Sequence, residues 1–307
     1  MIVAAFVEVL LPVIVVVVSG YALRRTYAPL DLRTLNRVSM YVLGPALIFT
    51  TLVRIEVTGA EALRISGASA LLVVAMGAIT YVVGRAARLD RASLAALLLC
   101  TMFMNSGNYG LPTTRFAFGE AGFQRALLYF IAQTILAQVL AIPIASLGSA
   151  ERANPLAQIF RMPQIYAVAA GLAARLGGLD LAHRADALGS VFNGVALMSD
   201  AALPLLLLLL GMQLAQGAGV EDGRLTALAA GLRLLVSPLL AWGIATALGL
   251  DDLALRVVVL EASMPTAVNM VLYSAEFGAR PRFVAGVVVV TTLGSLATLA
   301  ALLTVLR

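Results

Sequence analysis

The sequence of 307 residues contains no lysine, a single cysteine and a single histidine, and only 12% of its residues are charged. A single cysteine excludes an internal disulfide and a cysteine cluster for a metal. With only Cys100 and His183 available, the usual catalytic triads and zinc sites cannot be assembled. The sequence therefore predicts neither an enzyme nor a bound cofactor. The net charge of +5 comes entirely from arginines at the ends of apolar runs, so no nucleic-acid partner is expected.

Long apolar runs make up most of the sequence. Hydrophobic residues make up 61% of the chain and its mean hydropathy is +0.98, whereas soluble domains are roughly 45–50% apolar. A helix needs about 20 apolar residues to cross roughly 30 Å of hydrocarbon. The runs predict one all-α integral membrane domain with ten transmembrane helices in the lipid bilayer. They cover residues 2–23, 34–53, 64–84, 93–116, 122–147, 163–181, 188–214, 225–249, 253–277 and 283–306.

The arginines predict the orientation of these helices. Twelve of them lie in the loops that follow odd-numbered runs, eight lie on the opposite face, and Arg233 lies within a run. By the positive-inside rule the first set of loops is cytoplasmic, so both termini are expected to be extracytoplasmic. The first run contains Glu8 and lacks a basic leader, so we expect a retained span rather than a cleaved signal peptide.

The two halves of the chain share landmarks at a constant separation. Pro45 and Pro204 are 159 residues apart, and so are Gly119 and Gly278. Because a repeat of five helices has an odd number of spans, its second copy enters the membrane from the opposite side. Such inverted repeats are typical of secondary transporters. Chance similarity between apolar helices is the alternative. The predicted division is a first repeat at 1–147, a short cytoplasmic linker at 148–161 and an inverted second repeat at 162–307.

Two predicted spans are interrupted at corresponding places. The fourth contains MFMNSGNYGLPTTRF (102–116), and the ninth contains LEASMPTAVNM (260–270). Proline and glycine disfavour a helix interior, and a break exposed to lipid would leave backbone groups unsatisfied. Such breaks are tolerated where they line a protein-enclosed cavity, although a simple kink is the alternative. The fifth and tenth spans carry polar side chains, at Gln133, Gln138, Thr291, Thr292 and Ser295. Because Thr292 lies 159 residues after Gln133, these two spans are expected to flank the breaks, unless the polar residues make ordinary interhelical hydrogen bonds.

Broken helices present groups that can bind ions. The N-terminal end of a half-helix offers free N–H groups to a carboxylate, and the C-terminal end offers carbonyls to a cation. The residues predicted to bind a substrate at the breaks are Asn105, Asn108, Gly110, Pro112, Pro265 and Asn269. Glu261 is predicted to hold Na⁺ or carry H⁺, since a carboxylate within a span is costly and usually functional. A structural ion pair or hydrogen bond is the alternative for Glu261. Arg233 is expected to pair with a carboxylate or to snorkel.

The interrupted segments also resemble a known family. NSGNYGLPTTRFAFG (105–119) is similar to the N-x-x-N/G-x-G-[LI]-P-x-x-[RK]-x-x-x-G pattern of auxin efflux carrier proteins, which include the PIN-type carriers of plants. MPTAVNMVLYSAEFG (264–278) resembles the matching ninth span. The short linker resembles that of bacterial members, which implies a bacterial inner (cytoplasmic) membrane protein.

The resemblance implies an architecture and a mechanism. Runs one, two, six and seven would form a scaffold, and the other six would form a transport domain that moves as an elevator. The broken helices would cross at Pro112 and Pro265, with a small organic anion bound near Asn108 and Asn269. The implied substrates are malonate-like, malate-like or aromatic carboxylates. The resemblance also implies a homodimer formed through helices one, two and seven.

EASMP (261–265) departs from the plant carriers and is similar to the E-x-x-M segment of bile-acid sodium symporters. This second resemblance implies a Na⁺ site at Glu261, with Ser263 and Met264 beside it. The sequence thus predicts a cation-coupled secondary transporter of a small organic anion. The alternatives are an uncoupled carboxylate uniporter, an ion channel, an intramembrane enzyme with Asp200 and Glu261 as an acid pair, and a sensor that binds without transport.

Overall fold

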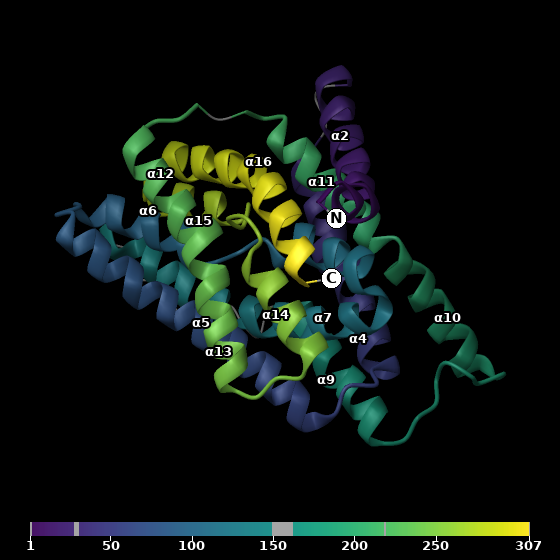
Figure 1. Cartoon of the computed structure of the whole chain (residues 1–307). Helices are drawn as coiled ribbons and strands as arrows, with labels where there is room; N and C mark the ends of the chain where they lie inside the picture. Colours follow the sequence, from purple (N-terminus) through teal and green to yellow (C-terminus); the bar gives the residue numbers. More distant parts are fainter. Residues whose placement is uncertain (1, 28–30, 149–161, 218, 307) are drawn as a thin grey trace. The chain divides into compact units, whose positions relative to one another are not determined.

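The computed structural model describes residues 2–27, 31–148, 162–217 and 219–306 (Figure 1). Regular structure in these ranges is helical, apart from one antiparallel bridge between Met104 and Thr266. The predicted all-α class is therefore confirmed. Six helices of the described ranges are long and apolar enough to cross a membrane. Of the predicted linker, only Gly148 lies within the described residues.

Contacts between residues divide the chain into two compact units, and each unit combines segments from both predicted halves. Unit 1 comprises Met1–Val13, Thr58–Pro155 and Gln216–Arg307. Unit 2 comprises Ile14–Val57 and Leu156–Ala215. Unit 2 thus holds residues 14–23 of the first predicted run and all of the second, sixth and seventh runs.

Unit 1 contains both interrupted segments. Its helical elements are α1 (Ile2–Ala5), η1 (Phe6–Leu10), α5 (Gly59–Ala86), α6 (Arg91–Met102), η3 (Ser106–Gly110), α7 (Leu111–Ala145), η4 (Ser146–Gly148), α12 (Gly223–Gly231), η5 (Leu232–Val236), α13 (Ser237–Ala247), α14 (Asp252–Ala262), α15 (Met270–Glu276) and α16 (Pro281–Leu306). The elements η1, η3 and η5 are π-helical turns. Helices α5, α13 and α14 pack against one another, as Figure 1 shows, and α7 packs against α5 and α14.

Unit 2 is built from shorter helices. They are α2 (Leu11–Thr26), whose first turn belongs to unit 1, α3 (Leu32–Val38), the π-helical η2 (Ser39–Leu43), α4 (Gly44–Arg54), α9 (Pro163–Leu176), α10 (Ala187–Asp200) and α11 (Ala202–Leu214). Helix α4 packs against α9 and α10. The fourteen residues of α9 are too few to cross a bilayer upright.

Aspartates in the short loops cap the N-terminal ends of several helices. Asp90 accepts a hydrogen bond of 2.7 Å from the Ser93 amide at the start of α6, and Asp251 accepts one of 2.7 Å from the Ala254 amide at the start of α14. Such caps satisfy one of the free N–H groups of a first turn. The hydrogen bond from Ser93 also lowers the pKa of Asp90 below its ordinary value.

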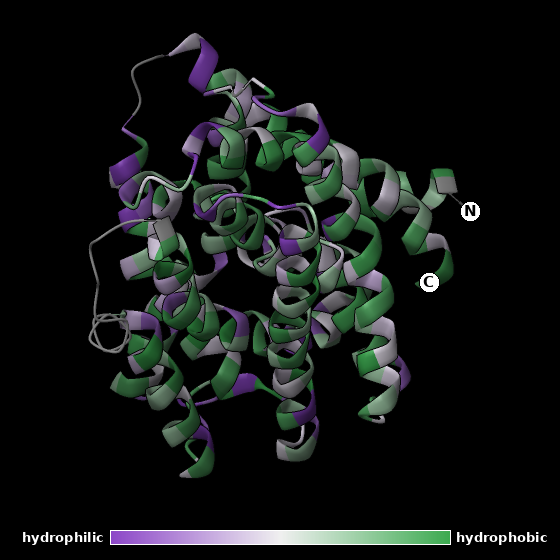
Figure 2. Cartoon of the chain, turned by 90° about the vertical axis from the view of Figure 1, so that its left-hand side faces the viewer, coloured by the Kyte–Doolittle hydropathy of each residue, from purple (hydrophilic) through white to green (hydrophobic). Residues whose placement is uncertain are grey.

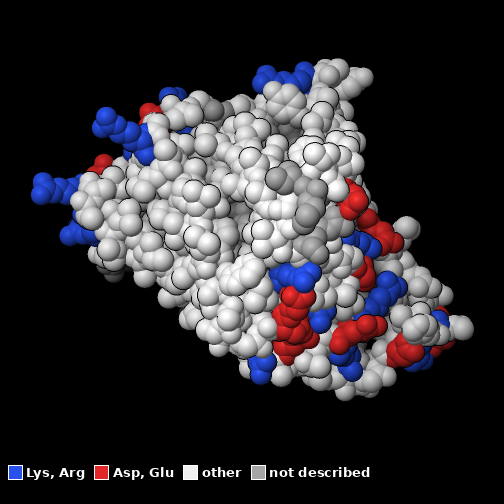
Figure 3. All heavy atoms as spheres, in the orientation of Figure 1, with Lys and Arg blue, Asp and Glu red and all other residues white. Residues whose placement is uncertain are grey.

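Polar and apolar residues separate along the helices as a bilayer requires. Figure 2 shows hydrophobic residues over most of the helical length and hydrophilic residues mainly at the ends and in loops. In Figure 3 the charged side chains gather at the margins of the visible face, and uncharged atoms fill the area between them. Large apolar side chains such as Leu71, Leu197 and Leu239 are more than half exposed. Exposed apolar surface of this kind suits contact with lipid chains.

Two glycines let α2 and α11 approach closely within unit 2. A Cβ atom on Gly211 would lie 2.8 Å from the backbone nitrogen of Tyr21, and one on Gly20 would lie 2.9 Å from the carbonyl carbon of Leu208. Small residues at such contacts allow backbones to pack without intervening side chains, which is a common source of helix association in membranes.

We therefore expect Gly211→Ala to lower the free energy of unfolding by roughly 1–3 kcal/mol, the usual range for overpacking. Thermal unfolding in detergent micelles measures the effect. Gly194→Ala in α10 is the matched control, because a Cβ there meets no atom within 4 Å. Equal melting temperatures for the two variants would contradict the close approach of α2 and α11.

Candidate functional site

The two interrupted segments of unit 1 pair antiparallel through their backbones, and we call the paired residues 103–105 and 265–267 the crossing. Helix α6 ends at Met102 and the extended residue Phe103 follows it, whereas α14 ends at Ala262 and a turn at Ser263 and Met264 precedes its paired stretch. The Asn105 amide donates to the Pro265 carbonyl at 2.7 Å, and the Ala267 amide donates to the Phe103 carbonyl at 3.0 Å. This pairing satisfies backbone groups that a membrane interior would otherwise leave without partners.

Side chains from the neighbouring long helices hold the paired stretches in place. On α7, the Gln133 side chain donates to the Met104 carbonyl at 2.6 Å and accepts a hydrogen bond of 2.5 Å from the Ser106 hydroxyl. On α16, the Thr291 hydroxyl accepts a hydrogen bond of 3.2 Å from the Thr266 amide. Gln133 and Thr291 thus flank the two breaks from the fifth and tenth predicted spans, as the sequence predicts. The Thr292 hydroxyl instead donates to the Val288 carbonyl of its own helix.

At each end of the crossing, the start of one half-helix meets the end of another. Element η3 packs against α14, and α15 packs against α6. Asn108 belongs to η3, which packs against α14, and Asn269 directly precedes α15, which packs against α6. Asn108 is half-buried and Asn269 is exposed. The first helical hydrogen bonds of η3 come from the Tyr109 and Gly110 amides, so the three preceding amides form the free N-terminal end of that half-helix.

Glu261 lies fully buried at the η3 end of the crossing. Its Oε1 accepts a hydrogen bond of 2.8 Å from the Thr114 hydroxyl on α7. Its carboxyl carbon would lie 2.8 Å from a Cβ placed on Gly110, so only glycine leaves room for it. The other oxygen, Oε2, has no hydrogen-bond partner within the described part of the chain. A buried carboxylate with one unsatisfied oxygen is stable only with a bound cation or as the neutral acid.

Asn105 contributes a second unsatisfied group to the crossing. The residue is buried, and its Nδ2 finds no hydrogen-bond partner among the described residues. Leaving such a donor buried and unpaired costs about 1–3 kcal/mol. A cation at Glu261 would be held by this single carboxylate together with hydroxyl and carbonyl oxygens, because no cluster of three His, Cys, Asp or Glu residues occurs in the ranges that the structure describes. Such donors suit Na⁺ or H⁺ better than a transition metal.

The remaining predicted residues lie in or beside the crossing, with different surroundings. Pro112 is in the first turn of α7, after the paired stretch, and Pro265 is within the pairing itself. Met264 is fully buried. The Ser263 hydroxyl donates to the Val259 carbonyl of its own helix at 2.6 Å. Asp200, considered as a partner of Glu261, is exposed and belongs to unit 2.

Arg233 lies beside the crossing as well, although the sequence predicts an ion pair or snorkelling for it. The side chain is fully buried in η5. It donates to the carbonyls of Thr101 and Ala262 and to the Ser237 hydroxyl. It makes no ion pair with a carboxylate of the described residues. An arginine in the middle of an apolar run indicates a buried polar contact. The sequence does not reveal the partners, because they are main-chain carbonyls from two distant segments.

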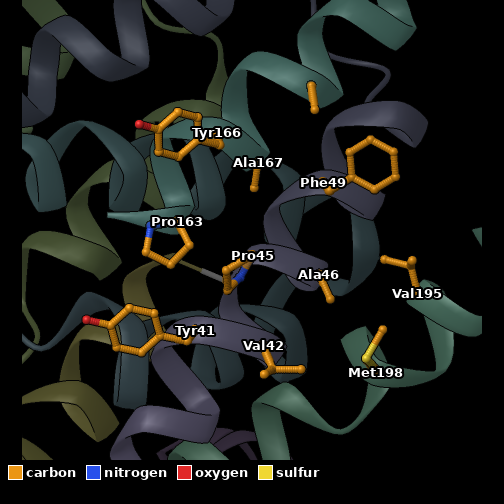
Figure 4. A pocket seen from close by; sticks show the side chains of 11 residues that line it. Tyr41, Val42, Pro45, Ala46, Phe49, Pro163, Tyr166, Ala167, Val195 and Met198 are labelled. Carbon is orange, nitrogen blue, oxygen red and sulfur yellow. The ribbon is translucent and has the colours of Figure 1, made fainter. Parts of the chain in front are cut away.

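Unit 2 has a hollow of its own, shown in Figure 4. Its volume is about 400 Å³, and its walls include Tyr41, Pro45, Phe49, Pro163 and Tyr166. Its lining contains no charged side chain. None of the predicted site residues lies in it. A carboxylate would find no cation there, so the crossing in unit 1 is the better candidate for an anion site.

Comparison with known proteins defines the class. The family model described as membrane transport protein matches residues 5–158 and 156–303. The chain therefore belongs to this family of membrane transporters, which includes the auxin efflux carriers. A transporter of the archaeon Methanothermobacter thermautotrophicus, described as uncharacterized, is 31% identical over 295 residues, covering 95% of each chain. A second such transporter, from Methanocaldococcus jannaschii, is 24% identical over 307 residues and covers 95% of this chain and 96% of its own.

The close approach of Gly110 to Glu261 can be tested by a double-mutant cycle. We expect Gly110→Ala to lower the melting temperature in wild type, because the new methyl group meets the carboxyl carbon. The same change should cost much less on a Glu261→Ala background, giving a coupling of about 0.5–3 kcal/mol. Gly231→Ala is the control, since a Cβ there meets no atom within 4 Å. Additive effects would show that Gly110 and Glu261 are not in contact.

Proposed function

We propose that this membrane transport protein is a secondary active transporter of a small organic anion, coupled to a cation through Glu261. The observation that carries the proposal is the crossing of two interrupted helices with unsatisfied polar atoms buried inside it. Broken helices whose ends meet within a membrane protein are typical sites for substrates and coupling ions. Glu261 Oε2 and Asn105 Nδ2 are two such atoms, both buried and without a hydrogen-bond partner among the described residues.

An inverted repeat of two five-helix halves is part of the proposal. In support, Asp90 and Asp251 cap the helices that lead into the two breaks. Beyond the breaks, Gly119 and Gly278 both adopt a positive φ, of 64° and 71°, where a glycine is favoured. The helical path through unit 1 thus repeats the same order of cap, helix, break and glycine. An odd number of spans in each half would make the copies antiparallel in the membrane.

The substrate would be a carboxylate that binds beside the crossing. The free amides at the start of η3 and the side-chain amide of Asn108 offer hydrogen-bond donors to an anion. Asn269 offers a second amide, at the exposed end near α6. Malonate-like, malate-like and aromatic carboxylates all carry the group that these donors recognise.

The two units support an elevator mechanism for the proposed transport. Unit 1 carries the crossing and both of its anchoring helices, α7 and α16, whereas unit 2 holds none of the site residues. A unit that carries the whole site can move as a body relative to the other. In this proposal unit 2 is the scaffold, its helices form a homodimer, and the protein lies in the cytoplasmic membrane with both termini outside.

Uptake of labelled carboxylates into proteoliposomes tests the function. The panel should include malonate, malate and an aromatic acid, with and without an inward Na⁺ gradient at fixed pH and with a pH gradient at fixed Na⁺. A secondary transporter gives saturable uptake and counterflow, stimulated by one of the two gradients. Saturable uptake that ignores both gradients would indicate a uniporter. Flux that does not saturate and shows no counterflow would indicate a channel and would refute the proposal.

We predict that Glu261→Gln abolishes the stimulation by Na⁺ or H⁺ and leaves the fold intact. Glutamine keeps the size of the side chain and an oxygen for the Thr114 hydroxyl, but it removes the charge and the titrating group. Gradient-driven uptake is the measurement, with thermal stability as a check on folding. Glu120→Gln is the control, because Glu120 is exposed and paired with Arg115 at 3.2 Å. A Glu261→Gln variant that still responds to both gradients would make Glu261 structural.

Single substitutions at the two ends of the crossing should show where the carboxylate binds. We expect Asn108→Ala or Asn269→Ala to lower uptake at limiting substrate by about tenfold, the typical effect of losing one hydrogen bond to a charged group. An effect of Asn108→Ala alone would place the carboxylate at the η3 end. If the double variant transports like wild type, the proposed binding site is wrong.

A further inference from the structure

Arg233 occupies an unusual place for a charged side chain. It lies in η5, between α12 and α13, which run as one helical path in Figure 1. This path, Gly223–Ala247, is one of the candidate membrane spans. At about 1.5 Å per residue, Arg233 is roughly 15 Å from one end and 20 Å from the other. The side chain is fully buried, so it cannot extend to a membrane surface as arginines near helix ends do.

The guanidinium group joins the C-terminal ends of both interrupted helices. One nitrogen donates at 2.7 Å to the carbonyl of Thr101, in the last turn of α6. The other donates to the carbonyl of Ala262, the last residue of α14, and to the hydroxyl of Ser237. Ser237 in turn donates to the same Ala262 carbonyl at 2.8 Å. One residue of a third helical path thus binds a main-chain carbonyl at each of the two breaks, while its Nε has no hydrogen-bond partner among the described residues.

The charges at this point nearly balance. The C-terminal end of a helix carries roughly half an elementary negative charge, so the two ends of α6 and α14 together carry about one. Carbonyl groups at interrupted helices commonly coordinate a cation in transporters. Here the guanidinium supplies one positive charge at the same carbonyls, fixed by a covalent link to the chain.

We propose that Arg233 is a built-in cation that holds the two helix ends of the crossing together. It fills the position that a bound ion would otherwise take between the Thr101 and Ala262 carbonyls, and it acts as a positioning residue for the site. The contacts of Arg233 do not depend on the proposed function, but its role in transport rests on that function. With these carbonyls permanently neutralised, Glu261 at the η3 end is left as the place for an exchangeable cation.

Chemical rescue tests this proposal on the purified full chain. In Arg233→Ala the carbonyls of α6 and α14 lose their cation, and the variant should melt at a lower temperature in detergent micelles than wild type. Millimolar guanidinium chloride should bind in the vacated space and raise the melting temperature of Arg233→Ala. Urea at the same concentration is the matched probe, because it has nearly the same shape and no charge. Guanidinium should not stabilise wild type or Arg224→Ala, which removes an exposed arginine from the start of the same helical path.

Two further variants separate charge from packing. Arg233→Lys keeps a positive charge with several donors, and Arg233→Met keeps a side chain of similar length without charge. We expect Lys to retain most of the stability, and Met to behave like Ala. The proposal is overturned if Lys and Met are equally destabilised, if urea rescues Arg233→Ala as well as guanidinium does, or if Arg233→Ala is as stable as wild type.

The same variants keep this test distinct from that of transport. The melting temperature and its rescue by guanidinium are measured without a substrate. They therefore test the role of Arg233 whether or not the protein transports an organic anion. In proteoliposomes, Arg233→Ala should lose about tenfold or more of any wild-type uptake, because unpaired carbonyls destabilise the crossing, and guanidinium should restore part of it. Rescue of stability with no wild-type uptake of any carboxylate would refute the proposed function and leave the role of Arg233 intact.

Discussion

The structure of unit 1 depends on the backbone pairing between two interrupted helices. In a hydrocarbon environment an interrupted helix is stable only if its free amides and carbonyls find partners within the protein. Here each break is the partner of the other, through Asn105 with Pro265 and Ala267 with Phe103. The long helices α7 and α16 then add the side chains that fix the crossing. The arrangement brings four half-helix ends to the paired stretches, with η3 against α14 and α15 against α6.

The two charged side chains near the paired stretches, Arg233 and Glu261, have different surroundings. Arg233 donates from two of its guanidinium nitrogens to the carbonyls at the ends of α6 and α14, while its Nε has no hydrogen-bond partner among the described residues. Glu261 lies at the η3 end, with one oxygen bound by Thr114 and the other without a partner in the described chain. The first is a permanent charge bound to two main-chain carbonyls, which suits a structural role. The second is an unsatisfied group, which suits an exchangeable ion or proton. The two charges therefore suit different roles, Arg233 in holding the helix ends and Glu261 in binding an exchangeable ion or proton.

The sequence predicts much of this architecture because the membrane imposes simple rules. Apolar runs predict helices, and a pair of proline- and asparagine-bearing interruptions predicts breaks at 103–105 and 263–269 that the structure contains. The division into two units, each drawn from both halves of the chain, depends on contacts that periodicity does not encode. The partners of Arg233 are equally invisible, since carbonyl groups carry no sequence signature. The sequence places Thr291 and Thr292 on the same span but does not decide which of them contacts the break, because a helical side chain changes its direction by about 100° with each residue.

We propose the crossing of unit 1 as the binding site of an organic-anion transporter. A crystal or cryo-EM structure of the full chain with a saturating transported carboxylate tests this site. Density for the carboxylate is expected beside the paired segments, within hydrogen-bond distance of the Asn108 or Asn269 amide. Density for the carboxylate in the apolar hollow between Tyr41 and Tyr166, with none at the crossing, would contradict it.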